Sequence, residues 1–192
     1  MSRETGQPAN KTADVLGMAL PLLMGAMKKN AQSPQGAEGL LNALSDRHSG
    51  GILDNLSDLF SGGVDANIKK DGEGILGHVL GQKQPTVENE LSRRSGLDTA
   101  AIAEMLKIAA PVVMGMLGRQ RAQSNITGAS DLNTMLGSFL GGQPSQNQDL
   151  ITSLIDSDGD GSVLDDVTDM VLGSNSGKSG GLGSLLGGLF GK

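Results

Sequence analysis

The stretch that decides the fold is residues 98–121, DTAAIAEMLKIAAPVVMGMLGRQR. Its apolar residues recur every three or four positions, which is the period of an α-helix. The spacing predicts a helix over Asp98–Arg121, with Ile102 and Leu106 facing a core. Pro111 lies inside the apolar stretch, where a proline removes a backbone hydrogen bond, so a kink or a break is expected there.

The same pattern occurs earlier in the chain. Pro21-Leu22-Leu23-Met24-Gly25 recurs as Pro111-Val112-Val113-Met114-Gly115, and Ala31-Gln32-Ser33 recurs as Ala122-Gln123-Ser124. The repeat predicts two units, each with a buried helix, a loop and a second amphipathic helix. The glycine in each unit is expected to let a neighbouring element approach closely. The first unit lacks the helices that precede Pro111, so the duplication is partial.

Helical spacing continues along most of the chain, and no alternating strand of five or more residues occurs. The sequence predicts an all-α fold: a small helical bundle with a helix-turn-helix unit, Gly-rich joints and a disordered C-terminal tail. The other helices are expected at Ala13–Lys29, Gly36–Leu44, Ile52–Phe60, Ile75–Leu80, Thr86–Ser95, Ser130–Phe139, Gln148–Ile155 and Leu164–Leu172.

Changes in composition divide the chain into five segments. They are a disordered N-terminus (1–12), a partial helical repeat (13–66), a helical domain with the helix-turn-helix (67–145), an acidic helix–loop–helix (146–172) and a Gly-rich low-complexity tail (173–192).

Composition restricts the chemistry of the chain. The 192 residues include 30 Gly, two His and no Cys, Trp or Tyr. The lack of Cys excludes disulfide scaffolds, thiol catalysis and Cys-based zinc sites, and two His leave little for a catalytic triad. We therefore expect a protein that is not an enzyme. His78 is expected to be a helix-end or half-buried structural residue, and His48 a surface loop residue.

The net charge of −6 is unevenly distributed. Seven Asp and no Lys or Arg lie between Ser145 and Leu172, so the rest of the chain is close to neutral. A neutral body provides no long-range basic field for nucleic acid. The polar N-terminus lacks a secretory signal, and the longest apolar run, Val15–Met27, is too short to span a bilayer. We expect a cytoplasmic protein with no transmembrane segment.

The segment Leu91–Leu106 fits a helix-turn-helix, with Gly96 in the turn and Asp98 capping the second helix. A DNA-binding unit needs Arg, Asn, Gln or Lys at the exposed start of that helix. Residues 99–104 offer mainly alanines and one glutamate instead. The sequence favours a structural unit, with DNA binding as the alternative.

The nine Met have two interpretations. Met at helical spacing usually fills a core, which is the main expectation. The alternative is a Met-rich pocket for an apolar ligand or a partner peptide, because Met side chains adapt to many shapes.

An acidic loop, Asp156-Ser-Asp-Gly-Asp-Gly-Ser-Val163, follows the opening of an EF-hand calcium loop. The carboxylates of Asp156, Asp158 and Asp160 stand at loop positions 1, 3 and 5, and Ser162 would supply a backbone carbonyl at position 7. Position 12 is Val167 in place of the usual Glu, so closure would fall to Asp165 or Asp166. The loop predicts a weak calcium site; the alternative is a capped acidic turn.

Four motifs together resemble the bacterial DUF937, or YidB-like, family over roughly residues 70–172, with the earlier partial copy outside the match. They are Gly74–Gly81, Leu91–Leu106, Ala110–Gly118 and Asp156–Val163. The family has unknown function and a helical, homeodomain-like fold, so the resemblance implies that fold and no catalytic residues.

Taken together, the sequence predicts a non-enzymatic helical scaffold or interaction protein with a weak calcium-binding loop. The alternative is a nucleic-acid-binding regulator that uses Leu91–Leu106. The expected partner is an unidentified protein or a second copy of the chain. The Leu- and Gly-rich end, Gly180–Lys192, is either a low-complexity tail or a segment that contacts a membrane surface or a partner.

Overall fold

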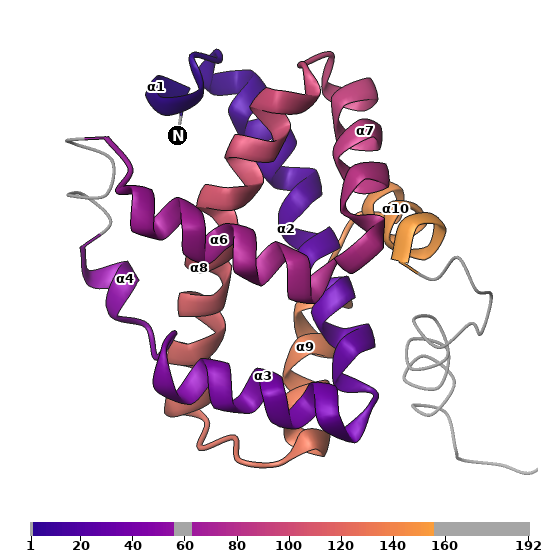
Figure 1. Ribbon diagram of the computed structural model, residues 1–192. Coiled ribbons are helices and arrows are strands. Elements are labelled where there is room, and N and C mark those ends of the chain that lie inside the picture. The colour runs from indigo at the N-terminus through magenta and orange to yellow at the C-terminus, as the bar shows by residue number, and fades with distance from the viewer. Residues whose placement is uncertain (1, 56–62, 156–192) are drawn as a thin grey trace, which may run out of the picture. The chain divides into compact units, whose positions relative to one another are not determined.

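A computed structural model describes residues 2–55 and 63–155 of the chain, and this part contains helices and no strand (Figure 1). The all-α prediction is confirmed for these residues. The described helices belong to one compact unit, Met1–Asp160. The predicted calcium loop, the predicted helix Leu164–Leu172 and the tail after it lie outside the described residues.

Two long helices, α2 (Ala9–Ala31) and α8 (Thr99–Gln123), form the centre of the unit. Both helices continue through their internal prolines, so of the kink or break expected at Pro21 and Pro111 the break does not occur. Both prolines are buried, and the packing around them offsets the lost hydrogen bond. Within the described residues α8 alone is long and apolar enough to cross a membrane, but 67% of its most apolar stretch is buried, as in the core helix of a globular protein.

The two predicted repeats interlock. Helix α3 (Pro34–Asp46) follows α2, and α9 (Ala129–Leu140) follows α8. Helix α9 packs on α2, the central helix of the other repeat, and α3 packs on both α2 and α8. The repeats therefore share one core.

We call the next helix along the chain the third helix of each repeat, and it also packs on the central helix of the other repeat. Helix α4 (Gly51–Asp54) packs on α8, and α10 (Ser145–Ile155) packs on α2. A Cβ added at Gly25 would lie 2.7 Å from Ile151 Cγ2, and one added at Gly115 would collide with Ile52 Cγ2. The expected close approach at both glycines is confirmed.

Helix α6 (Ala66–Val79) packs along α8 and is longer than the predicted Ile75–Leu80. The Asp65 carboxylate caps its start by accepting a hydrogen bond from the Asn67 N–H at 2.7 Å. Gly72 then lies against the Lys107 backbone of α8, where no side chain would fit. The first half of α6 is mostly polar, so the spacing of apolar residues did not predict it as helix.

A short 3₁₀ turn, η1 (Gly81–Lys83), leads into α7 (Gln84–Ser95), which ends at Gly96. Gly96 has a φ of 72°, and Asp98 accepts a hydrogen bond from the Ala101 N–H at 2.8 Å to cap α8. Ile102 and Leu106 are fully buried. The predicted roles of these residues are confirmed.

The predicted segments differ from the structure in two respects. The N-terminus forms α1 (Ser2–Thr5), and α2 begins at Ala9, so a disordered segment over 1–12 is wrong. An ion pair between Glu4 and Lys69 of α6 (3.6 Å) holds this end. Segments 13–66 and 67–145 pack in one unit and are not separate domains. The predicted helix Ile52–Phe60 is described only as far as the end of α4.

Candidate functional site

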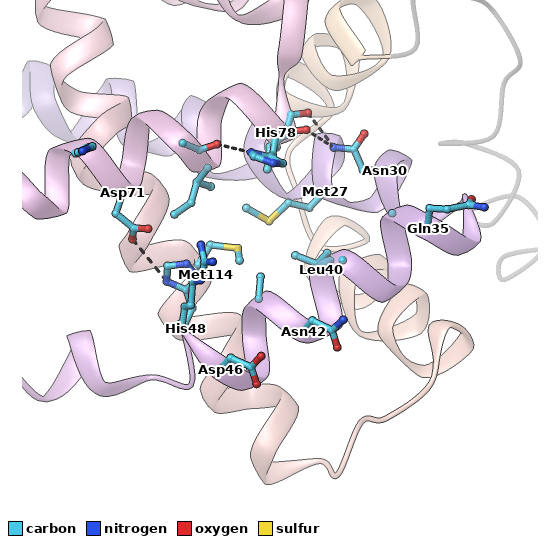
Figure 2. A pocket seen from close by; sticks show the side chains of 18 of the residues that line it. Met27, Asn30, Gln35, Leu40, Asn42, Asp46, His48, Asp71, His78 and Met114 are labelled. Carbon is cyan, nitrogen blue, oxygen red and sulfur yellow. Dashed lines mark hydrogen bonds and ion pairs between the residues drawn. The ribbon is translucent and has the colours of Figure 1, made fainter.

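A cavity of about 920 Å³ lies between α3 and α6 (Figure 2). This volume is in the usual range of ligand-binding sites. The two helices run antiparallel, because the end of α3 faces the start of α6 through His48 and Asp71. At the other end Asn30, which precedes α3, contacts the end of α6.

Each wall of the cavity is one face of a helix. The lining residues recur at helical spacing, with Gln35, Gly36, Gly39, Leu40, Asn42, Ala43, Asp46 and Arg47 at the end of α3, and Asn67, Lys70, Asp71, Gly74, Ile75, His78 and Val79 on α6. Buried Met27 of α2 and Met114 of α8 form the floor. The rim is exposed at Asn42 and Lys70. The cavity is therefore an open groove with an apolar floor and a polar rim.

Two glycines leave the walls without side chains. A Cβ added at Gly39 of α3 or at Gly74 of α6 would meet no atom within 4 Å. Both glycines stand inside helices, where glycine is less favourable than alanine by roughly 0.5–1 kcal/mol. A larger side chain would therefore fit at either position without a clash. The absence of a side chain at both positions keeps the groove wide.

His48 closes one end of the groove. The residue is 9% exposed, and its Nδ1 lies 3.8 Å from Oδ2 of Asp71. Burial lowers the pKa of the imidazole, and the charge of Arg47 lowers it further, while the carboxylate of Asp71 opposes this shift. The predicted surface position of His48 is wrong. The residue is buried because its carbonyl lies against Gly118 of α8.

Asn30 and His78 close the other end. The side-chain amide of Asn30 donates to the carbonyls of His78 (3.2 Å) and Val79 (3.1 Å), which α6 leaves unpaired at its end. The His78 ring is hydrogen-bonded through Nδ1 to the Gly74 carbonyl at 2.8 Å. His78 stands in the last turn of α6, which is the helix-end position predicted as one of two alternatives, and it is exposed.

The lining of the groove is suited to binding an apolar surface. Met27, Met114, Leu40 and Ile75 offer apolar contact, and the rim amides and charges can accommodate polar groups at its edge. Among the described residues no group of three or more His, Cys, Asp or Glu is placed to hold a metal ion. The six predicted calcium ligands, Asp156, Asp158, Asp160, Ser162, Asp165 and Asp166, lie outside the described residues.

Sequence reasoning missed this groove as a unit. The prediction of a Met-rich pocket identified the type of floor, and Met27 and Met114 are both core residues and lining residues. The missing signal was the spacing of small and polar residues on α3 and α6, such as Gly39 with Asn42 and Gly74 with His78. Such spacing marks a helix face that does not pack against a neighbour.

The basic residues of α7 are already paired. Glu90 lies 2.6 Å from Nη2 of Arg93 and 2.6 Å from Nε of Arg94. Hydrogen bonds from both guanidinium groups lower the pKa of Glu90 to about 2. These two arginines are the only basic residues that the sequence offers next to the turn at Gly96.

Comparison with known proteins identifies a family. The model of a family described as bacterial protein of unknown function (DUF937) matches residues 1–120 and 123–192. The match extends well beyond the range 70–172 expected from the sequence motifs and includes the first repeat. No curated protein and no solved structure matches the chain.

Proposed function

Because the chain belongs to the DUF937 family of bacterial proteins, whose description assigns no activity, we propose a function from the groove itself. The protein is a non-enzymatic helical interaction protein, and the groove between α3 and α6 binds an apolar segment of a partner protein. The observation that carries the proposal is an open groove of about 920 Å³ with two methionines in its floor.

The dimensions of the groove favour a helical segment as the occupant. Its walls have 13 and 14 residues and are therefore about 20 Å long at 1.5 Å per residue. A helix of that length and about 10 Å in diameter, half inside the groove, would occupy on the order of 800 Å³. Amphipathic helices bind in such grooves through residues spaced three and four apart, and Met-rich floors adapt to them.

The proposal is tested with a neutral apolar probe, N-phenyl-1-naphthylamine, whose fluorescence rises in an apolar site. We expect saturable binding to the wild-type protein and at least about tenfold weaker binding to Gly39→Leu or Gly74→Leu, whose side chains would fill the groove. Gly77→Leu is the matched control on α6, because Gly77 is exposed and lies outside the lining. Equal binding by all variants, or none by the wild type, contradicts the proposal.

The segment Leu91–Leu106 is proposed to be a homeodomain-like helix-turn-helix with a structural role. Its second helix continues into the core, and Arg93 and Arg94 are engaged by Glu90. These pairs weigh against the alternative of a nucleic-acid-binding regulator. Fluorescence anisotropy with a labelled DNA duplex at physiological salt should show no specific binding. A specific complex that Arg93→Ala with Arg94→Ala abolishes would support the alternative.

A weak calcium site at the acidic loop remains part of the proposal and rests on the sequence alone. Asp156, Asp158 and Asp160 alternate as the first ligands of an EF-hand loop do. Isothermal titration with calcium should give a dissociation constant on the order of 10⁻⁵ to 10⁻³ M, lost in Asp158→Ala. The absence of heat at millimolar calcium would favour the capped turn. The chain is proposed to act in the cytoplasm.

A further inference from the structure

We infer that His48 makes binding in the groove sensitive to pH, so that a proton on its imidazole opposes occupation of the groove by an apolar segment. The inference rests on the proposed function, because it describes how the same groove is regulated. It depends on where His48 lies, which is in the lining at the end where α3 and α6 meet (Figure 2).

The position of His48 is fixed by the backbone on both sides. Its N–H donates to the Ala43 carbonyl at 3.0 Å, which continues the end of α3. Its carbonyl lies against Gly118, where α8 has no side chain. The backbone is therefore held in place, and it puts the imidazole in the lining of the groove.

None of the charged groups around His48 forms a hydrogen-bonded ion pair with its imidazole. Asp71 of α6 is 41% exposed and 3.8 Å away, which is too long for a hydrogen bond. Asp46 and Arg47 at the end of α3 and Lys70 of α6 are exposed at the rim and partly cancel. From the α8 side, Arg119 is engaged by Asp54 and by the Gly50 carbonyl. His48 is 9% exposed and lines the groove, so the part of it that still meets solvent faces the water in the groove.

An apolar occupant would remove that water. Desolvation disfavours the charged imidazolium, so binding would lower the pKa of His48 further and release a proton where the residue is protonated. By linkage, affinity falls as pH decreases through the range in which free His48 gains its proton. His78 stands at the far end with an exposed ring, and its desolvation on binding is expected to be smaller.

The first test measures the proton directly. The chain has two histidines, so the ring Cε1–H resonances of His48 and His78 are assigned with one variant, His78→Gln. Saturating N-phenyl-1-naphthylamine, which is itself neutral over this range, should lower the NMR titration midpoint of His48 by at least about half a pH unit. An unchanged His48 midpoint in a protein that binds the probe overturns the inference.

The second test measures affinity. Between about pH 8 and pH 5 the dissociation constant of the probe should rise by roughly three- to tenfold in the wild type. His48→Gln should remove this dependence, while His78→Gln keeps it. A wild type that binds the probe equally at all pH values, or a His48→Gln protein with the wild-type profile, overturns the inference but leaves the proposed function intact. A wild type that binds no probe at any pH contradicts the proposed function first.

Discussion

At Gly25 and Gly115 the absence of a side chain sets how closely two helices pack. Each glycine receives an isoleucine from the third helix of the other repeat, Ile151 at Gly25 and Ile52 at Gly115. The same local motif, Pro-x-x-Met-Gly, therefore produces the same contact twice. The two sites are equivalent in sequence and in packing.

This equivalence predicts that Gly25→Ala and Gly115→Ala each destabilise the protein. The added methyl group must displace an isoleucine in a packed contact, and overpacking of this kind costs roughly 1–3 kcal/mol. Gly17→Ala in α2 is the matched control, since a Cβ there meets nothing within 4 Å, and it should stabilise slightly. Urea unfolding followed by far-UV circular dichroism measures all three. Equal effects at the packed and the open positions would contradict the packing argument.

Burial of His48 predicts a pH dependence of stability without any ligand. The unfolded chain gains a proton at this residue near its ordinary pKa of 6.5, whereas the folded chain gains it only at lower pH. The free energy of unfolding should therefore fall as the pH decreases from about 7.5 through 6.5 and below, until folded His48 is also protonated. His48→Gln should flatten this part of the curve in urea titrations made at several pH values. A wild-type stability that rises in this range would refute the assignment.

At the scale of elements, the junction of α7 and α8 is the clearest case of a local signal that determines structure. Gly96 adopts a positive φ that other residues adopt at a cost, and Asp98 provides a hydrogen-bond acceptor to the first turn of α8. Both features depend on one residue each, so they were visible in the sequence.

We predict that Gly96→Ala and Asp98→Ala each lower the free energy of unfolding by about 1 kcal/mol, for different reasons. Alanine at a φ of 72° is strained by its Cβ, and loss of the Asp98 side chain leaves the Ala101 N–H without its acceptor. Asp98→Asn should retain most of the stability, because Asn is also a good N-cap residue. Thermal unfolding of the three variants gives the comparison. Equal losses in Asp98→Asn and Asp98→Ala would argue against capping.

Elements whose signals are not local were predicted less well. Helix α6 begins at Ala66, nine residues before the predicted start at Ile75. Its first half is stabilised by the Asp65 cap and by contact with α8. The prolines of α2 and α8 lie inside continuous helices, since packing overrides their intrinsic preference. The groove forms between α3 and α6, which are separate in the sequence and face each other only in the folded chain. His48 is buried by a contact with Gly118 of α8, which is also distant in the sequence. A sequence pattern contains no record of such contacts.

At the scale of the whole molecule, the exchange of helices between repeats ties the two halves together. Helix α2 packs on α9 and α10 of the second repeat, and α8 packs on α3 and α4 of the first. Each central helix is therefore covered in part by helices of the other repeat.

This interlocking predicts that segments 13–66 and 67–145 unfold together. The two histidines report on the two segments separately, because His48 lies in the first and His78 in the second. Their ring resonances, followed by NMR in increasing urea, should give one common midpoint that coincides with the loss of helix measured by circular dichroism, as a two-state transition requires. Gly25→Ala should move both midpoints to lower urea by the same amount, although Gly25 belongs to the first segment. If the His48 midpoint moved while the His78 midpoint stayed in place, the segments would be independent domains, and the shared core would not be the unit of folding.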